Sequence, residues 1–279
     1  MSASRIMVGA CAAIAATAAL TGCVGADGEG DSSAPLLAPA VVNSAAVKTP
    51  AASGKDVPYS YMTAEGLLAT AQANMRDSGA MTISMNAVEE GQKLQVKAAL
   101  TAKGTCAAAL RIGGRNIQII TTDARHAYMK ADDAFWRQTG GSRGDKVVDA
   151  IDGRWVKLTQ EMASNGGVRE FCSLTEMLDG LLLTDDDSDT EVVKGEPTTL
   201  DGKQVIPLIE KLPDETDTMY VSTGSTPYIV KIEGEGGDSP GSGTFGDFGK
   251  DPHVVAPPPS QTVDMADLGI EPGDGDFAV

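Results

Sequence analysis

Residues 81–100 read Met81-Thr-Ile-Ser-Met-Asn-Ala-Val-Glu-Glu-Gly-Gln-Lys-Leu-Gln-Val-Lys-Ala-Ala-Leu100 and decide the fold class. Every second residue is apolar on both sides of the turn at Glu89–Gln92. The alternating residues are Met81, Ile83 and Met85, then Leu94, Val96, Ala98 and Leu100. A period of two places these side chains on one face of two strands, so the stretch predicts an antiparallel hairpin with one buried face.

The same pattern continues along the rest of the chain. We expect further strands at 106–112, 117–119, 126–130, 154–158, 191–194, 203–210, 218–222, 227–234, 243–248 and 253–256. Short connections favour antiparallel neighbours, because parallel pairing needs a long crossover. The sequence therefore predicts one antiparallel sheet of roughly ten strands.

Two longer segments have helical spacing. Thr63 is a candidate N-cap for a helix that runs to about Arg76, and Ser173 and Glu176 have the spacing of a capping box. The apolar faces of these two helices consist of Leu67, Leu68, Ala71 and Met75, and of Met177, Leu178, Leu181 and Leu182. Shorter helical pieces are expected at 132–137 and 145–149. The fold class is therefore α+β, an antiparallel sheet covered by two or three α-helices.

The N-terminus is typical of a secretion signal. Arg5 precedes a short alanine-rich apolar run, and Leu20-Thr-Gly-Cys23 follows it. The run is too short for a permanent transmembrane helix, which needs about 20 apolar residues. Leu-Thr-Gly-Cys resembles the lipobox of bacterial lipoproteins, which implies cleavage before Cys23 and a diacylglyceryl group on its sulfur. The alternative is an ordinary secretory signal with a chance cysteine.

Composition divides the remaining chain. We predict a lipoprotein signal peptide over 1–22, a disordered Ala/Gly/Ser/Pro-rich tether over 23–58, one domain over 59–256 and a flexible acidic tail over 257–279. The chain has 22 Lys and Arg against 39 Asp and Glu, a net charge of −17. This charge argues against nucleic acid as a partner, because nucleic-acid binding needs a cationic surface.

Two cysteines remain in the predicted domain. Cys106 and Cys172 would both be exposed to an oxidising compartment, so we expect them to form a structural disulfide. No CxxC spacing and no histidine near either cysteine supports a metal or redox site.

Three patterns that resemble functional sites have simpler interpretations. Gly237–Gly241 matches GxSxG, but Pro240 lacks the N–H that an oxyanion hole needs after Ser239. The acids of 185–196 resemble a calcium loop, yet Thr190 stands where glycine is required. His126 is interpreted as a surface strand residue. We therefore expect no catalytic residue, no metal and no cofactor.

Four segments resemble actinobacterial lipoproteins of the LppX/LprG kind. They are residues 128–136, 153–157, 201–203 and 219–228. The resemblance implies a LolA/LolB-like fold, in which a strongly curved antiparallel sheet, a half-barrel, forms with its helices an apolar chamber for acyl chains. Small residues on the central strands, Ala98, Ala99 and Ala107–Ala109, could leave volume for such a chamber or could let a helix pack closely.

These observations together predict a non-enzymatic, monomeric lipoprotein on the extracytoplasmic face of the cell membrane, which binds or carries a lipid or lipoglycan. Its anchor would be Cys23, and its protein partners are unknown. The candidate ligand-lining residues are Leu67, Leu68, Met75, Leu100, Leu110, Ile117, Ile119, Met177, Leu178 and Leu181. The alternative function is a cell-surface interaction lipoprotein with a filled core and no lipid ligand.

Overall fold

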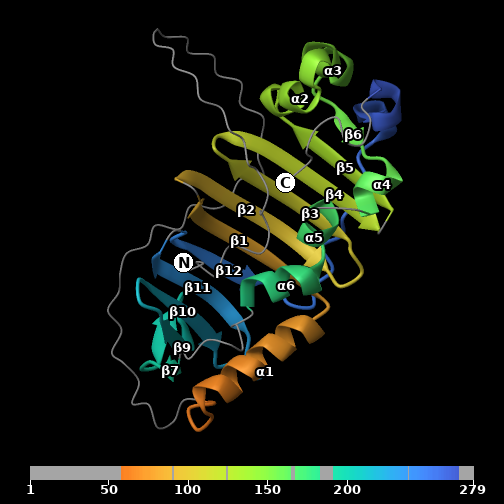
Figure 1. Ribbon diagram of the computed structural model, residues 1–279. Helices are drawn as coiled ribbons and strands as arrows, with labels where there is room; N and C mark the ends of the chain where they lie inside the picture. The colour runs from red at the N-terminus through yellow and green to blue at the C-terminus, as the bar shows by residue number, and fades with distance from the viewer. Residues whose placement is uncertain are drawn as a thin grey trace.

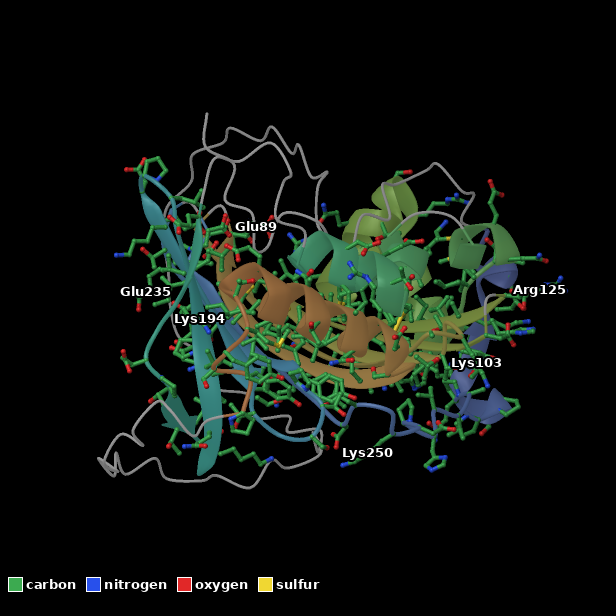
Figure 2. All side chains as sticks on the ribbon, turned by 90° about the horizontal axis from the view of Figure 1, so that it is seen from below. Glu89, Lys103, Arg125, Lys194, Glu235 and Lys250 are labelled. Atoms are coloured by element: carbon green, nitrogen blue, oxygen red, sulfur yellow. A yellow bond between two sulfur atoms is a disulfide. The ribbon has the colours of Figure 1, made fainter. Side chains whose placement is uncertain are left out.

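A computed structural model describes residues 58–89, 91–123, 125–164, 167–182, 191–237 and 239–269. Within these ranges thirteen strands form one sheet, in the order β13-β6-β5-β4-β3-β2-β1-β12-β11-β10-β9-β7, with β8 paired to β9. The two edges, β13 and β7, do not pair with each other, so the sheet is not closed. It bends strongly, which gives it one concave face (Figures 1 and 2).

Long strands form the centre of the sheet and short ones its edges. The central strands are β1 (Ala80–Glu89), β2 (Gln92–Thr101), β3 (Cys106–Ile112), β4 (Arg115–Asp123), β5 (His126–Ala131), β9 (Lys203–Lys211), β10 (Glu215–Ser222), β11 (Ile229–Gly236) and β12 (Gly241–Gly246). The short strands are β6 (Trp155–Lys157), β7 (Val192–Lys194), β8 (Thr198–Leu200) and β13 (Thr262–Asp264). The hairpin predicted over 81–100 is β1 and β2, with Met81 opposite Leu100.

Helices cover the concave face. α1 (Ala64–Asp77), α4 (Gln160–Ser164), α5 (Gly167–Phe171) and α6 (Leu174–Leu182) lie over it, whereas α2 (Asp133–Thr139), η1 (Gly141–Arg143) and α3 (Gly144–Ile151) lie beside β6 (Figure 1). The cover therefore contains more and shorter helices than the two or three predicted.

The two helix starts predicted from the sequence form as expected. The Thr63 hydroxyl accepts a hydrogen bond from the Gly66 N–H at 3.1 Å, and Ser173 Oγ accepts one from the Glu176 N–H at 3.2 Å. An ion pair of 2.7 Å between Arg76 and Asp179 joins α1 to α6. These bonds set where each covering helix begins and hold the two longer ones together.

The start of α1 is also held to the edge of the sheet. Lys194 Nζ on β7 donates a hydrogen bond to the Ser60 carbonyl at 2.6 Å and another to the Met62 carbonyl. The Tyr59 hydroxyl donates to the carbonyls of Gly224 and Ser225 at 2.9 Å. α1 is thus fixed across the β7 end of the concave face.

The C-terminal part corrects three predictions. The tail predicted to be flexible from 257 contains η2 (Pro259–Gln261), β13 and η3 (Met265–Leu268), and Met265 is fully buried. β13 pairs with β6 in parallel, so the sheet is mixed rather than purely antiparallel. The strand predicted at 253–256 has no regular structure.

The sheet order explains this arrangement. β12 and β13 lie on opposite sides of six strands, so the fifteen residues 247–261 must cross about 34 Å of sheet at about 4.8 Å per strand. A nearly extended chain of that length reaches about 50 Å. Figure 2 shows this crossing segment, which includes the labelled Lys250, on the side of the sheet opposite α1. The connection is therefore long enough to bring β13 to the free edge of β6, where the two strands pair in parallel.

Candidate functional site

The concave face of the sheet is arranged in rows of cross-strand neighbours. One row runs Phe245, Ile83, Ala98, Ala108, Ile119, Met129 and Val156, and the next runs Leu208, Met219, Ile232, Gly243, Met85, Val96, Leu110 and Ile117. The side chains of both rows are apolar and buried, as expected when every second residue of each strand points to the same face. The concave face is thus a continuous apolar floor from β9 to β6.

The helices supply the side chains opposite this floor. Leu67, Leu68 and Met75 of α1 and Met177 and Leu178 of α6 belong to the same buried cluster as Leu100, Leu110, Ile117 and Ile119 of the sheet. The structure therefore brings together nine of the predicted lining residues. The side chain of the tenth, Leu181, lies outside the described part of α6, and Cys23 lies outside the described residues.

The sequence analysis missed half of the floor. Ile206, Leu208, Met219, Val221 and Ile232 line its β9–β11 side and are buried to the same degree as the predicted residues. Their alternating spacing was visible in the sequence. It predicted strands there, but nothing local indicated that these strands share a face with β2–β4, because β11 reaches β1 only through β12.

Small side chains lie in the middle of the floor. Ala98 and Ala108 are direct cross-strand partners, and Ile83 and Ile119 flank them in the same row. The other alanines that were expected to leave volume above the sheet, Ala99, Ala107 and Ala109, are out of phase with these two and point to the opposite face. The floor is therefore lowered at two alanines rather than five.

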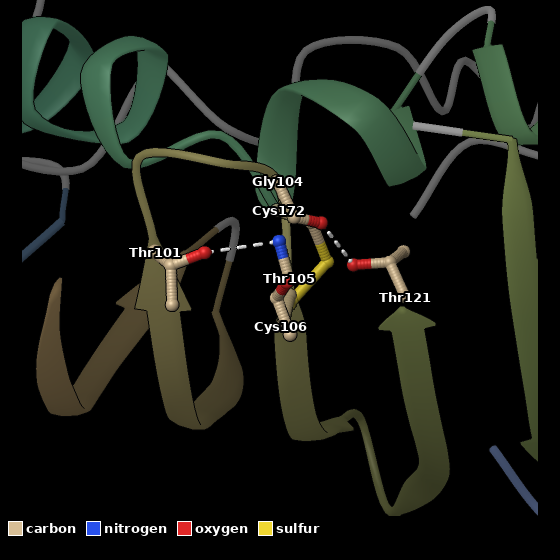
Figure 3. Close-up of a disulfide and its surroundings, with 6 residues drawn as sticks. All are labelled: Thr101, Gly104, Thr105, Cys106, Thr121 and Cys172. Atoms are coloured by element: carbon tan, nitrogen blue, oxygen red, sulfur yellow. Dashed lines mark hydrogen bonds between the residues drawn. A yellow bond between two sulfur atoms is a disulfide. The ribbon is translucent and has the colours of Figure 1, made fainter. Parts of the chain in front are cut away.

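A disulfide connects the floor to the cover. Cys106 at the start of β3 is bonded to Cys172, which follows α5, and their Cα atoms are 5.4 Å apart (Figure 3). Around it, the Thr105 N–H donates to Thr101 Oγ1 at 3.1 Å, and Thr121 Oγ1 donates to the Gly104 carbonyl at 2.7 Å (Figure 3). The disulfide holds the connection between α5 and α6 against the first residue of β3.

Three carboxyl groups lie at the opposite end of the strands from the disulfide. Glu210 of β9 and Glu215 and Asp217 of β10 are at most 7% exposed, and Asp217 is directly opposite Glu210. They continue the inward phase of Leu208 and Met219, so they belong to the concave face. Burial, followed by repulsion from Glu215 and Glu210, raises the pKa of Asp217 to about 7. We call these three residues the acidic rim.

The acidic rim was not predicted, although the sequence carried a signal for it. Asp217 is two residues from Met219, and Glu210 is two residues from Leu208, so both acids occupy inward positions of alternating strands. A charged residue at an inward position is rare and calls for a partner or a function. The alternation of apolar residues along β9 and β10 is therefore enough to predict that Glu210 and Asp217 point inward.

The catalytic patterns lie in ordinary structural positions. Ser239 is in the short connection between β11 and β12, where the Pro240 carbonyl accepts a hydrogen bond from the Val88 N–H at 3.0 Å. No helix follows it, as a nucleophile elbow requires. His126 is exposed and pairs with Asp123 at 2.8 Å, and residues 185–190 of the calcium-like stretch lie outside the described ranges.

Metal ligands and membrane-spanning helices can be assessed over the described part of the chain. No group of three or more His, Cys, Asp and Glu side chains there is placed to hold a metal ion. No described helix combines the length and apolarity that crossing a membrane requires.

Comparison with protein-family models and with curated proteins found no match. Solved structures with a distant likeness include LprF from Mycobacterium bovis, with a TM-score of 0.44 and 9% identity over 70% of this chain and 96% of that one. The lipoprotein LppX from Mycobacterium tuberculosis gives a TM-score of 0.41 and 10% identity over 68% and 99% of the two chains. A LolA superfamily protein from Nitrosomonas europaea gives 0.22 and 8% over 67% and 92%. The neighbours thus include the kind of lipoprotein that the sequence motifs resemble.

Proposed function

We propose that this protein is a membrane-anchored extracytoplasmic lipoprotein that binds or carries a lipid or lipoglycan between its sheet and its helices and makes or breaks no bond. A diacylglyceryl group on Cys23 would anchor it. The observation that carries the proposal is the long apolar floor of an unclosed sheet, which is covered by short helices rather than by a second sheet.

Such a floor suits an acyl chain for a simple energetic reason. Moving a methylene group out of water onto apolar side chains is worth about 0.8 kcal/mol, so a chain that lies along several strands would bind by desolvation alone. Ala98 and Ala108 lower the floor beneath the helices, and the disulfide and the Arg76–Asp179 ion pair hold the cover at two points. No catalytic group is needed for this role.

The alternative is an interaction lipoprotein whose core is filled by its own side chains. One observation favours it: Leu67 and Leu178 on the helices and Leu100 and Ile119 on the sheet are all 0% exposed. Neighbouring side chains that cover these residues completely would leave no room for a guest. The two functions therefore differ in what fills the space above Ala108.

A pair of alanine substitutions separates the two functions. Ala108→Leu places three extra carbons on the concave face, whereas Ala109→Leu places them on the opposite face of the same strand. In a lipid carrier, Ala108→Leu lowers the amount of bound lipid and leaves the melting temperature close to that of the parent chain. In a filled core the same change overpacks the interior and costs about 1–3 kcal/mol of stability.

The measurement is native mass spectrometry of the full chain purified from the membranes of its own host. Copurified lipid that is reduced by Ala108→Leu and kept by Ala109→Leu supports carriage. Lipid-free protein in every preparation, together with a destabilised Ala108→Leu, would establish the filled core instead.

A further inference from the structure

The acidic rim contains an acceptor without a donor. Asp217 is 3% exposed, and its Oδ1 atom is buried with no hydrogen-bond partner. Such an atom is uncommon in a folded protein, because a buried polar group that loses water normally gains a protein partner. Both groups that act on it electrostatically, Glu215 and Glu210, are themselves acidic.

A cation on the same face of the sheet, two strands from Asp217, is engaged elsewhere. Lys194 of β7 faces the same side of the sheet as Val192, which is the direct partner of Glu210. Its Nζ atom, however, donates to the carbonyls of Ser60 and Met62 at the start of α1. The structure thus directs this cation to α1 instead of to Asp217.

The sheet beside Asp217 carries almost no side chains. The cross-strand partner of Asp217 on β11 is Gly234. Gly234 pairs with Gly241 on β12, and Gly241 pairs with Ala87 on β1. These cross-strand partners share the concave face, so three consecutive strands present at most one methyl group next to the carboxyl. We call Gly234, Gly241 and Ala87 the bare strip.

The apolar floor ends at this strip. Met219 and Asp217 are successive inward residues of β10, about 7 Å apart along the strand. A molecule with acyl chains along the Met219 row would therefore place its polar end over the bare strip and beside Asp217. The apolar floor would thus contact the acyl chains of an amphiphile, and the bare strip and the buried carboxyl would contact its headgroup.

We propose that Asp217 and the bare strip form a headgroup subsite that accepts a hydrogen bond from an ammonium or hydroxyl group of the bound lipid. This inference rests on the proposed function. Three neighbouring acids disfavour a headgroup that presents only phosphate or carboxylate oxygens, whereas an N–H or O–H donor would satisfy the orphaned Oδ1. The ligand class is thus a donor-bearing lipid, either an aminophospholipid or a glycosylated diacylglycerol.

The test uses three lipids with identical acyl chains. The full chain is reconstituted through its own anchor into vesicles that contain equal parts of phosphatidylethanolamine, glucosyl diacylglycerol and phosphatidylcholine. The phosphatidylcholine headgroup has the zwitterionic charge of phosphatidylethanolamine but no donor. After brief solubilisation, native mass spectrometry identifies the lipid that stays bound. We expect donor-bearing lipids to exceed phosphatidylcholine by about tenfold, the factor that one charge-assisted hydrogen bond provides.

Variants assign any preference to this carboxyl. Asp217→Leu removes the acceptor and should abolish the preference, while Glu235→Gln, on an exposed residue of β11, removes one negative charge and should keep it. If Asp217→Leu does not fold, Asp217→Asn takes its place, and its loss of charge should at least reduce the preference for phosphatidylethanolamine.

The outcomes are distinct. Selection of phosphatidylethanolamine alone or of the glycolipid alone supports the subsite and identifies its donor as ammonium or hydroxyl. Equal capture of all three lipids, or a preference that persists in the Asp217 variants, overturns the subsite and leaves lipid carriage intact. Capture of no lipid contradicts the proposed function itself, and the subsite with it.

Discussion

Removing the charge of Asp217 should stabilise the protein, and the gain should grow with pH. In the folded protein, burial and repulsion by Glu215 and Glu210 raise the pKa of Asp217 from 3.8 to about 7. In the unfolded chain this pKa returns to its ordinary value. The folded state therefore keeps a proton that the unfolded state has already released, and stability falls as pH rises from about 4 through 7.

The magnitude follows from that difference in pKa. A raised carboxyl pKa destabilises the folded state at high pH, and the full shift corresponds to about 4 kcal/mol at 1.36 kcal/mol per pKa unit. Local relaxation and water penetration around a buried charge reduce this penalty, so we expect about 2 kcal/mol above pH 7. Asp217→Asn has no titrating group and should avoid this loss. The variant should exceed the parent chain by about 2 kcal/mol at pH 8 and by much less at pH 4.

Urea denaturation at a series of pH values measures this directly. The free energies of unfolding of the parent chain and of Asp217→Asn are compared at matched m-values, because a change in m would signal a different unfolded state. Glu235→Gln is the control, since it makes the same chemical change at an exposed site of β11. A constant difference between parent and Asp217→Asn across pH 4–8 would contradict this prediction, because it would mean that Asp217 has the same pKa in the folded and unfolded states.

Two further predictions concern the contributions of the disulfide and of the C-terminal segment to stability. Replacing Cys106 and Cys172 together by alanine should lower the free energy of unfolding by about 4 kcal/mol. The chain-entropy relation gives this value for a loop with a sequence separation of 66. Urea titration of the double variant and of the parent chain measures the difference. Met265→Ala should cost about 2–4 kcal/mol in the same assay because Met265 is fully buried, whereas exposed Val255→Ala should cost little; equal effects of the two changes would show that residues beyond 257 do not pack.

Local patterns in the sequence predicted most of the elements. The alternation of residues 81–100 is a property of neighbours along the chain, so it identifies β1, β2 and their common face without any distant contact. The same holds for the helix starts, where Thr63 and Ser173 accept hydrogen bonds from residues three positions later. The cysteine count and the predicted oxidising compartment were enough to expect the bond between Cys106 and Cys172. The anchor at Cys23 stays a prediction.

Other features depend on which strands become neighbours. β13 has only three residues, too few for a periodic pattern that would predict a strand. It forms because the crossing segment brings Thr262–Asp264 to the free edge of β6. The bare strip needs β11, β12 and β1 side by side, although β1 lies far earlier in the chain. Long-range packing sets which distant segments pair, so short stretches of sequence do not predict these pairs.

Sequence alone was enough to predict the alternating strands, the capped helices, the acidic charge and the inward positions along β1 and β2, because all of these follow from periods and residue types within a few positions. The bare strip beside the orphaned carboxyl of Asp217, and the addition of residues beyond 257 to the sheet, arise only when distant strands pair. Backbone hydrogen bonds between strands form with any side chain, so the register and the neighbours of each strand depend on the packing of the whole domain.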